Sequence, residues 1–387
     1  MNGGAGAGPL AGLMVLDFSQ FLAGPSAALR LADLGARVIK IERPAGGEAG
    51  RHLTLKQLEL DGDSLLFHTI NRHKESYAAD LRDPQDLARV RRLIGHADVL
   101  IESFRPGAMA RLGLDPDSVR DLNPRLVYGS ISGYGPEGPW RDRPGQDLLV
   151  QARSGLVWLN GDAGQGPVPF GLSVADLFTG THLAQGILAC LVRRGRTGRG
   201  GLVEVSLLES VLDLQFEVLT THLNDGGRPP ERCAVGNAHA YLSAPYGIYP
   251  TADGFLALAM GSVPRLGELI GCPDLARFAE PAAWFDQRDA IRALVAARLR
   301  EDGTEVWLGR LRPGGYWCAD VLDWNQLEAH AGFQSLGMVQ EVRRLGTAAF
   351  RTTRCPLRID GRLLTCVQGA PRVGADNAAI EAELDRW

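Results

Sequence analysis

Residues 13–44 constrain the fold of this chain more than any other segment. Leu13 to Phe18 is a short apolar run, which is typical of a buried β-strand. The next residues, Ser19 to Pro25, predict a tight loop that leads into a helix, because proline loses no needed hydrogen bond in the first turn of a helix. A helix is therefore expected directly after the first strand.

A second strand is predicted to follow that helix. The helix is expected over Ala27 to Leu34, and Gly35 stands where a C-terminal cap favours a positive φ. Arg37 to Ile41 then has the pattern of a strand. These elements predict a β-α-β unit, whose loop opens at the carboxyl end of a strand, where α/β folds bind their ligands.

The alternation of strands and helices continues beyond this unit. A helix is expected over Ala88 to Ile94, strands over Asp98 to Glu102 and Leu126 to Ser132, and a further helix over Gly180 to Arg193. Val203 to Leu208 is either another strand or the start of the next helix. Four strands separated by helices predict an α/β fold with a parallel sheet that is covered on both faces.

The second half of the sequence has a different pattern. One long helix is predicted near Glu209 to Leu223, and Asn224 to Pro230 is a composition break typical of a linker. Ala244 to Ala259 predicts a β-hairpin. Near the end, Leu357 to Ile359 and Leu363 to Cys366 predict two short strands.

Composition excludes several classes of protein. With 387 residues, of which 45% are hydrophobic, the chain can bury a large core and is expected to form two domains. Its net charge of −4 predicts no nucleic-acid partner, and the basic segment Arg193 to Gly201 is interpreted as a solvated turn. No apolar run suggests a membrane span and no secretory signal is expected. The six cysteines form no C-x-x-C pair, which favours reduced thiols in a cytoplasmic protein over disulfides or metal sites.

A nicotinamide or flavin enzyme is the first alternative that the β-α-β unit suggests. Glu42 follows the second strand, where an acidic residue could hold a ribose. The first loop, however, contains no G-x-G-x-x-G, and a pyrophosphate needs close backbone approach at those glycines. Dinucleotide binding is therefore not expected.

Two clusters of polar residues are candidates for phosphate binding and catalysis. Ile101 to Arg111 begins at the end of a strand and carries Phe104, Arg105 and a second arginine; Arg43 ends a neighbouring strand. Arginine suits phosphate because its planar guanidinium donates two parallel hydrogen bonds, although surface arginines often have no such role.

The second cluster is Ser173 to Gly180, which contains Asp176. A carboxylate here could be a helix cap or a nucleophile, and the pattern alone favours the cap. Gly145-Gln146-Asp147 is interpreted by itself as a polar turn before a helix that begins at Leu148.

Several long segments in a fixed order resemble one family. They are LDFSQFLAGPSAALRLADLGARVIKIERP, NRHKESYAADLRDP, DVLIESFRPGAMARLGLD, ISGYGPEGP, LSVADLFTGTHLAQGILACL and RTGRGGLVEVSLLES. In this order they strongly resemble the class III CoA-transferases, the family of formyl-CoA and carnitine CoA-transferases, which also contains α-methylacyl-CoA racemases. The resemblance covers nearly the whole chain.

The resemblance implies a reaction and a set of site residues. Asp176 occupies the position of the family's nucleophile, which forms an aspartyl-CoA thioester and passes CoA from an acyl-CoA to a carboxylic acid. Coenzyme A is thus a substrate, and no tightly bound cofactor is implied. Gly261 matches part of the family's glycine loop, whose richer glycine run this chain lacks. The positions that resemble the family's CoA contacts are Arg43, Ala79, Arg82, Ser103, Phe104, Arg105 and Arg111.

Departures from the family pattern narrow the substrate and leave two alternatives. Leu22 and Gln146 replace the glutamine and tyrosine of formyl-CoA transferases, which argues against formyl or oxalyl substrates. Gln146 also stands where the family's racemases carry a histidine, and a glutamine cannot exchange a proton near neutral pH. An acyl-CoA racemase or isomerase remains the first alternative, and a non-catalytic partner subunit of a heteromeric transferase remains the second.

The resemblance also implies an architecture. A large Rossmann-like CoA-binding domain with a parallel sheet is expected over 1–223, and a smaller α+β domain with linkers over 224–335. The segment 336–387 is expected to return to the large domain. Family members form dimers whose chains are threaded through each other, so an interlocked homodimer is expected. The expected partners are acyl-CoA and carboxylic acids, with no nucleic acid and no membrane.

Overall fold

The computed structural model describes residues 8–387, which divide into two compact units. The first unit contains 8–150, Ser173–Leu214 and Leu336–Trp387, and the second contains Gln151–Leu172 and Gln215–Ser335. The domain boundaries expected from the sequence lie after residues 223 and 335. In the structure the chain enters the second unit twice, at Gln151 and at Gln215, and returns to the first unit each time. The three consecutive segments expected from the sequence include only one such passage.

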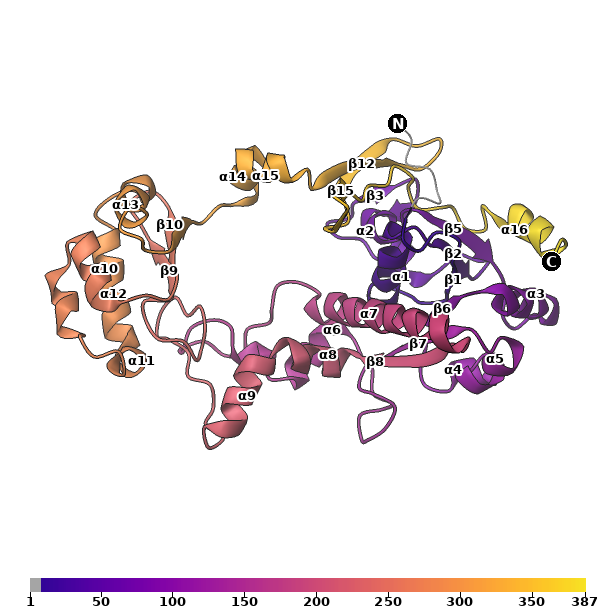
Figure 1. The fold of residues 1–387 in the computed structure, drawn as a ribbon, viewed down its shortest axis with the longest axis horizontal. Helices are drawn as coiled ribbons and strands as arrows, with labels where there is room; N and C mark the ends of the chain where they lie inside the picture. The colour runs from indigo at the N-terminus through magenta and orange to yellow at the C-terminus, as the bar shows by residue number, and fades with distance from the viewer. Residues whose placement is uncertain (1–7) are drawn as a thin grey trace. The chain divides into compact units, whose positions relative to one another are not determined.

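A six-stranded sheet forms the centre of the first unit (Figure 1). Its strands are β1 (Met14–Asp17), β2 (Arg37–Glu42), β5 (Lys74–Ala78), β6 (Val99–Glu102), β7 (Val127–Ser132) and β8 (Gly201–Ser206). All neighbouring strands are parallel, in the order β5-β2-β1-β6-β7-β8. The predicted parallel α/β sheet is confirmed, and its order reverses direction between β1 and β6, as in doubly wound folds.

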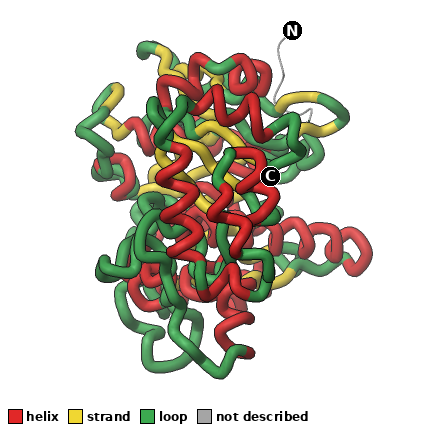
Figure 2. The backbone as a smooth tube through the Cα atoms, turned by 90° about the vertical axis from the view of Figure 1, so that its left-hand side faces the viewer, coloured by secondary structure: helices red, strands yellow, loops and turns green. Residues whose placement is uncertain are grey.

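Helices cover both faces of this sheet; Figure 2 colours helices red and strands yellow. On β7, Tyr128 belongs to the hydrophobic cluster that includes residues of α3 (Pro84–His96) and α16 (Asn377–Leu384). The next residue, Gly129, faces the other way, toward Leu183 of α7 (Val174–Thr197). Successive side chains of a strand point to opposite faces, so this pair marks the two helical layers.

The first unit also contains further helices and short strands. They are α1 (Ala23–Asp33), η1 (Ala49–His52), β3 (Glu59–Leu60), β4 (Asp63–Ser64), α2 (Leu65–Ile70), α4 (Ala108–Arg111), α5 (Pro116–Leu122), α6 (Asp147–Arg153), α8 (Leu207–Leu214), β12 (Val339–Arg343), β13 (Ala349–Thr353), β14 (Arg358–Ile359) and β15 (Arg362–Leu363). The predicted cap at Gly35 is confirmed, because its φ is 101° directly after α1.

Helices α1 and α7 pack together closely at one point. A Cβ added to Gly180 would lie 2.6 Å from the carbonyl oxygen of Ala23 and 2.2 Å from Oγ of Ser26. Only glycine permits this approach, which brings the first turn of α1 against α7. By length and composition α7 could also cross a membrane, which departs from the sequence-based expectation, but core helices of globular proteins share this property.

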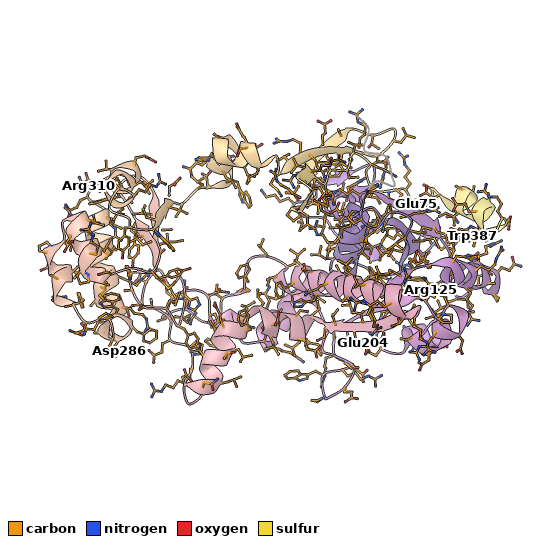
Figure 3. All side chains as sticks on the ribbon, in the orientation of Figure 1. Glu75, Arg125, Glu204, Asp286, Arg310 and Trp387 are labelled. Carbon is orange, nitrogen blue, oxygen red and sulfur yellow. The ribbon has the colours of Figure 1, made fainter. Side chains whose placement is uncertain are left out.

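The edge strand β5 was not predicted. Its residues Lys74, Glu75 and Ser76 are polar, so the segment lacks the apolar pattern of a buried strand. In the structure these polar groups find partners: Lys74 Nζ donates to Asp17 at 2.8 Å, and Glu75 (labelled in Figure 3) pairs with Arg37 at 2.7 Å. Long-range ion pairs therefore stabilise a strand that hydrophobicity does not indicate.

The C-terminal segment covers the free side of β5. The Asn377 side chain accepts from the N–H of Ala78 at 2.8 Å and donates to its carbonyl at 2.9 Å. Asp376 accepts from the N–H of Ser76 at 2.8 Å. These side chains occupy backbone groups that an edge strand would otherwise expose.

The long helix predicted near Glu209 to Leu223 is interrupted in the structure. It forms α8 and then α9 (Phe216–Asn224), with Gln215 between them. Gln215 is buried and donates from its side chain to the carbonyl of Ser154 at 3.3 Å. The break coincides with the boundary between the two compact units, which a local helical pattern does not reveal.

The second unit has its own core and a small antiparallel sheet. The predicted hairpin is confirmed as β9 (Gly247–Pro250) and β10 (Phe255–Leu258), to which β11 (Cys318–Asp320) adds a third strand. Trp307 is fully buried in the core. The other elements are η2 (Leu156–Trp158), α10 (Val263–Ile270), η3 (Pro273–Arg277), α11 (Ala283–Asp286), α12 (Arg288–Leu299), α13 (Thr304–Leu311), α14 (Trp324–Ala329) and α15 (Ala331–Leu336).

Candidate active site

Most of the candidate residues lie at one edge of the six-stranded sheet. Arg43 directly follows β2, Ala79 and Arg82 follow β5, and the segment 103–111 follows β6. Because the strands are parallel, their carboxyl ends meet at the same edge. The fold therefore brings together residues that lie far apart in the sequence.

The loop after β1 lies in the middle of this edge. Its Gln20 N–H donates to Oγ of Ser103, after β6, at 3.1 Å. This hydrogen bond joins the two loops where the strand order reverses, the point at which open α/β sheets bind ligands. The candidate Ser103 thus has a defined structural partner on the neighbouring loop.

Arginines at this edge present their guanidinium groups to solvent. Arg105 and Arg111 are exposed, and within residues 8–387 neither forms a side-chain ion pair. Arg43 is also exposed and donates only weakly, to the carbonyl of Gly47 at 3.3 Å. Arg82 pairs with Asp80 at 3.2 Å in an exposed contact, which contributes little. These donors remain accessible to an anionic ligand.

The two candidates for apolar contacts with CoA belong to one hydrophobic cluster. Ala79 is buried within it, and Phe104 packs against it while half-buried. The Phe104 N–H donates to Glu102 at 2.8 Å, and burial raises the pKa of the Glu102 carboxyl. Phe104 thus has a fixed backbone partner in the same loop that carries Arg105 and Arg111.

Asp176 lies in the first turn of α7, not at its cap. The helix begins after Ser173, and the carboxylate of Asp176 forms no hydrogen bond with any described residue. The prediction of a helix cap is therefore wrong. A half-buried carboxylate without a partner is free to react with a ligand.

Asp147 performs the capping role instead. Its Oδ1 accepts from the N–H of Ala175 at 2.7 Å and from the N–H of Asp176 at 3.3 Å. The segment that carries Asp147 is held near the end of β7, because a Cβ on Gly133 would lie 2.6 Å from the Cα of Gly145. The two glycines let the backbones touch, and this brings Asp147 to α7.

Two effects raise the pKa of Asp176 to about 7. The larger is burial, which penalises the charged carboxylate, and the smaller is the negative charge of Asp147. A strongly shifted carboxyl at the edge of a sheet where ligands bind is a candidate functional group. Near neutral pH about half of such groups are ionised and able to act as nucleophiles.

The three candidate pocket residues occupy different places. Leu22 caps α1 and is half-buried, and Gln146 is exposed beside Asp147. Gly261 belongs to the second unit, where a Cβ would lie 2.6 Å from the hydroxyl of Tyr316, so that position also requires glycine. Among the described residues there is no group of His, Cys, Asp and Glu able to hold a metal ion, and all the cysteines are free.

Two further residues at the carboxyl edge of the sheet were not predicted from the sequence. Phe21 has a left-handed φ of 63°, which is rare for a residue with a large side chain, and its N–H donates to Glu48 at 3.1 Å. Glu48 is buried although its local sequence, GGEAG, suggests a solvated loop. Neither property leaves a local signal, because both depend on contacts between loops.

The second unit contains a cavity of about 860 Å³. Its walls include Trp158, Leu219, His222, Arg232 and Arg288. Neither Asp176 nor any of the candidate CoA contacts lines it.

Comparison with known proteins gives a consistent result. The family model described as CoA-transferase family III matches residues 10–377. A succinate–glutarate CoA-transferase of Agrobacterium fabrum is 34% identical over 97% of this chain and 96% of its own length. A probable fatty acyl-CoA transferase of Mycobacterium tuberculosis is 33% identical over 97% and 98%.

Solved structures resemble the whole chain as well. The crystal structure of a CAIB/BAIF family protein from Brucella suis matches with a TM-score of 0.83 and 32% identity, over 98% of this chain and 100% of that one. A mutant of a Mycobacterium tuberculosis protein matches with a TM-score of 0.84 and 33% identity, over 97% and 99%.

Proposed function

Because the chain belongs to CoA-transferase family III, we propose that it moves CoA from an acyl-CoA to a carboxylic acid with Asp176 as the nucleophile. Relatives are named for CoA transfer between small acids, among them succinate, glutarate and oxalate. The observation that carries the proposal is the carboxylate of Asp176, which has no partner in the described chain while Asp147 caps its helix.

The proposed reaction proceeds through two covalent states of Asp176. The ionised carboxylate attacks the thioester carbonyl, the C–S bond breaks, and a mixed anhydride forms with release of CoA thiolate. The thiolate then attacks the aspartyl carbonyl, and the acyl group leaves as a free carboxylate. The aspartyl-CoA thioester finally passes CoA to an acceptor carboxylate by the same steps in reverse. Covalent catalysis divides one difficult transfer into easier steps.

The arginines at the sheet edge are proposed to bind the phosphates of CoA. Arg43, Arg82, Arg105 and Arg111 are all exposed there, after three different strands. Phe104, half-buried on the hydrophobic cluster beside them, offers an apolar surface to the adenine or the pantetheine, and Ala79 is buried within the same cluster. A local arginine cluster binds polyphosphate even on a protein with a net charge of −4.

A racemase remains less well supported. Racemisation at an acyl α-carbon needs a second proton-exchanging group besides Asp176, and Gln146 cannot exchange a proton near neutral pH. Asp147 is engaged with the start of α7 through the N–H groups of Ala175 and Asp176. Exchange of an α-proton with solvent deuterium in an acyl-CoA would favour this alternative.

Intact-protein mass spectrometry tests the proposal. The protein is incubated with a panel of acyl-CoAs, and Asp176→Ala serves as the comparison. We expect a CoA adduct that hydroxylamine removes and that maps to Asp176 in the wild type alone. An adduct at another residue, or none with any donor despite CoA binding, would contradict the nucleophile.

The protein is also proposed to act as an interlocked homodimer. Helix α9 buries none of its side chains within residues 8–387, and Phe216 and Leu223 are 66% and 71% exposed on it. Exposed apolar helix faces of this kind commonly mark interfaces between chains. Sedimentation analysis is expected to give twice the chain mass of 41.7 kDa at micromolar concentration.

A further inference from the structure

The loop between β1 and α1 is held by fixed partners at every backbone N–H from Phe18 to Phe21. Phe18 donates to the carbonyl of Ile101 at 2.8 Å, and Ser19 donates to its neighbour Asp17 at 3.0 Å. Gln20 donates to Ser103 at 3.1 Å and Phe21 to Glu48 at 3.1 Å. A loop held so completely presents its side chains in one arrangement.

Buried charges supply several of these partners. Lys40 is fully buried, and its Nζ donates to the carbonyl of Ser19 at 2.9 Å. It lies 3.8 Å from Oε1 of Glu48, a buried atom without a hydrogen bond among the described residues. Lys74 Nζ bonds to Asp17 at 2.8 Å and to the carbonyl of Pro25 at 2.9 Å. Burial of charged groups costs desolvation free energy, which ion pairing offsets only in part. A cluster of buried charges around one loop therefore indicates a role other than stabilising the fold.

Phe21 is the residue that this arrangement constrains most. Its φ of 63° is strained for a residue with a Cβ, and such strain persists only where the surroundings enforce it. Ser19 is buried and Leu22 half-buried, but the Phe21 side chain is 49% exposed. A large aromatic ring is thus kept at the surface of an otherwise closed loop.

This loop lies beside the first turn of α7. Gly180 contacts Ala23 and Ser26, at the start of α1, and both helices begin at the carboxyl edge of the sheet. Asp176 precedes Gly180 by one helical turn, about 6 Å along the same face. Asp176 therefore lies one turn nearer the start of α7 than the point where α7 meets the first turn of α1, which directly follows Phe21 and Leu22.

We propose that Phe21 is a specificity-determining residue for the acyl group, and that Glu48 is the positioning residue that holds it there. The inference rests on the proposed function of Asp176. With Leu22, the ring offers an apolar surface next to the nucleophile, which favours acyl groups with a hydrocarbon chain over short dicarboxylic acyl groups. Burial of a second carboxylate against such a surface is unfavourable.

Rates of adduct formation with two donors test this inference. Hexanoyl-CoA and succinyl-CoA leave the same aspartyl-CoA group on Asp176, so mass spectrometry compares them directly. For the wild type we expect faster formation with hexanoyl-CoA. Phe21→Ala should lower the hexanoyl-to-succinyl ratio by roughly tenfold, the usual size of a lost apolar contact. The exposed position of Phe21 leaves the folded core intact.

Variants of Glu48 separate positioning from simple stability. Glu48→Ala removes the acceptor of the Phe21 N–H and should lower the same ratio, whereas Glu48→Gln keeps an acceptor oxygen and should preserve it. The double variant Phe21→Ala/Glu48→Ala should change the ratio no more than Phe21→Ala alone. The matched control is Asp33→Asn, which removes a different buried carboxylate, paired with Arg72 at 2.9 Å, and should leave the ratio unchanged.

The outcomes are distinct. An unchanged ratio in Phe21→Ala, or a wild type that prefers succinyl-CoA, overturns the inference while an adduct at Asp176 still supports the transferase. A lowered ratio in Asp33→Asn equal to that in Glu48→Ala overturns the positioning role. No adduct with any donor overturns the proposed function, and this inference with it.

Discussion

Asp147 caps the helix that carries Asp176, with its Oδ1 2.7 Å from the N–H of Ala175 and 3.3 Å from that of Asp176 itself. One carboxylate thus occupies the N–H groups of the helix start, while the other remains without a hydrogen bond in the described chain. The same contact places a second negative charge near Asp176, which helps to raise its pKa. Helix geometry and carboxylate chemistry are coupled through this pair.

Asp147→Asn should shift the pH dependence of adduct formation. Asparagine keeps an oxygen that can accept both N–H groups but removes the charge, so the pKa of Asp176 should fall. We expect the midpoint of the rate profile to move to lower pH. Asp147→Ala also removes the cap and should cost about 1 kcal/mol of stability. An unchanged midpoint in Asp147→Asn would show that burial alone raises the pKa.

The wild-type rate should itself follow the ionisation of Asp176. Its pKa is raised to about 7, so the reactive carboxylate is scarce at pH 5.5 and abundant at pH 8.5. Formation of the CoA adduct is expected to rise about tenfold for each pH unit below 7 and to level off above it. Stopped reactions analysed by mass spectrometry give this profile. A rate that is flat from pH 5 to 8 is incompatible with this carboxyl as the nucleophile.

The same raised pKa predicts a pH-dependent stability. Because the folded-state pKa of about 7 exceeds the unfolded value of 3.8, the stabilisation from protonated Asp176 is complete below pH 3.8 and is lost as the pH rises to about 7. Asp176→Asn lacks this loss. Relative to the wild type, the variant should gain about 3 kcal/mol between pH 4.5 and 8, as measured by urea unfolding. An equal change of unfolding free energy with pH in the wild type and in Asp176→Asn would refute this prediction.

Gly180→Ala should disturb the packing of α1 on α7. The new Cβ would lie 2.2 Å from Oγ of Ser26 and 2.6 Å from the carbonyl of Ala23, so the helices must separate. We expect a loss of about 1–3 kcal/mol in unfolding free energy and slower adduct formation. Gly195→Ala is the matched control, because a Cβ there meets no atom within 4 Å and alanine favours helix. Equal effects of the two substitutions would contradict the close contact.

Arg105→Gln should weaken CoA binding. Arg105 is exposed at the carboxyl edge of the sheet, and loss of one phosphate contact at a solvated site should raise the Kd for CoA by roughly threefold to tenfold. Arg125, labelled in Figure 3, precedes β7 at the opposite edge, so Arg125→Gln should leave the Kd unchanged. Isothermal titration with CoA gives both values. An equal loss in the two variants would place the phosphates elsewhere.

The sequence predicted the elements that local rules control. The strand before Ser19, the left-handed cap at Gly35 and the hairpin of β9 and β10 follow from nearby residues, and the structure contains all three. Ordered motifs also identified the family, which the comparisons confirm. Hydrophobic periodicity and turn residues determine such features within a few positions of the chain.

Other features depended on contacts between distant segments. Lys74 was not assigned to a strand, because its burial requires Asp17 as a partner. The local pattern around Asp176 favoured a cap, although the family resemblance implied a nucleophile, because the residue that caps the helix, Asp147, comes from another part of the chain. Hydrogen bonds and ion pairs of this kind leave no periodic signal in the sequence.

The sequence by itself therefore determined the family, the parallel sheet and the list of candidate residues. Only the tertiary structure decided which carboxylate caps α7 and which stays unpaired, and that Glu48 holds Phe21 in a left-handed conformation. The physical reason is that a buried charge or a strained residue is tolerated only when several distant groups converge on it. Such convergence is a property of the folded chain.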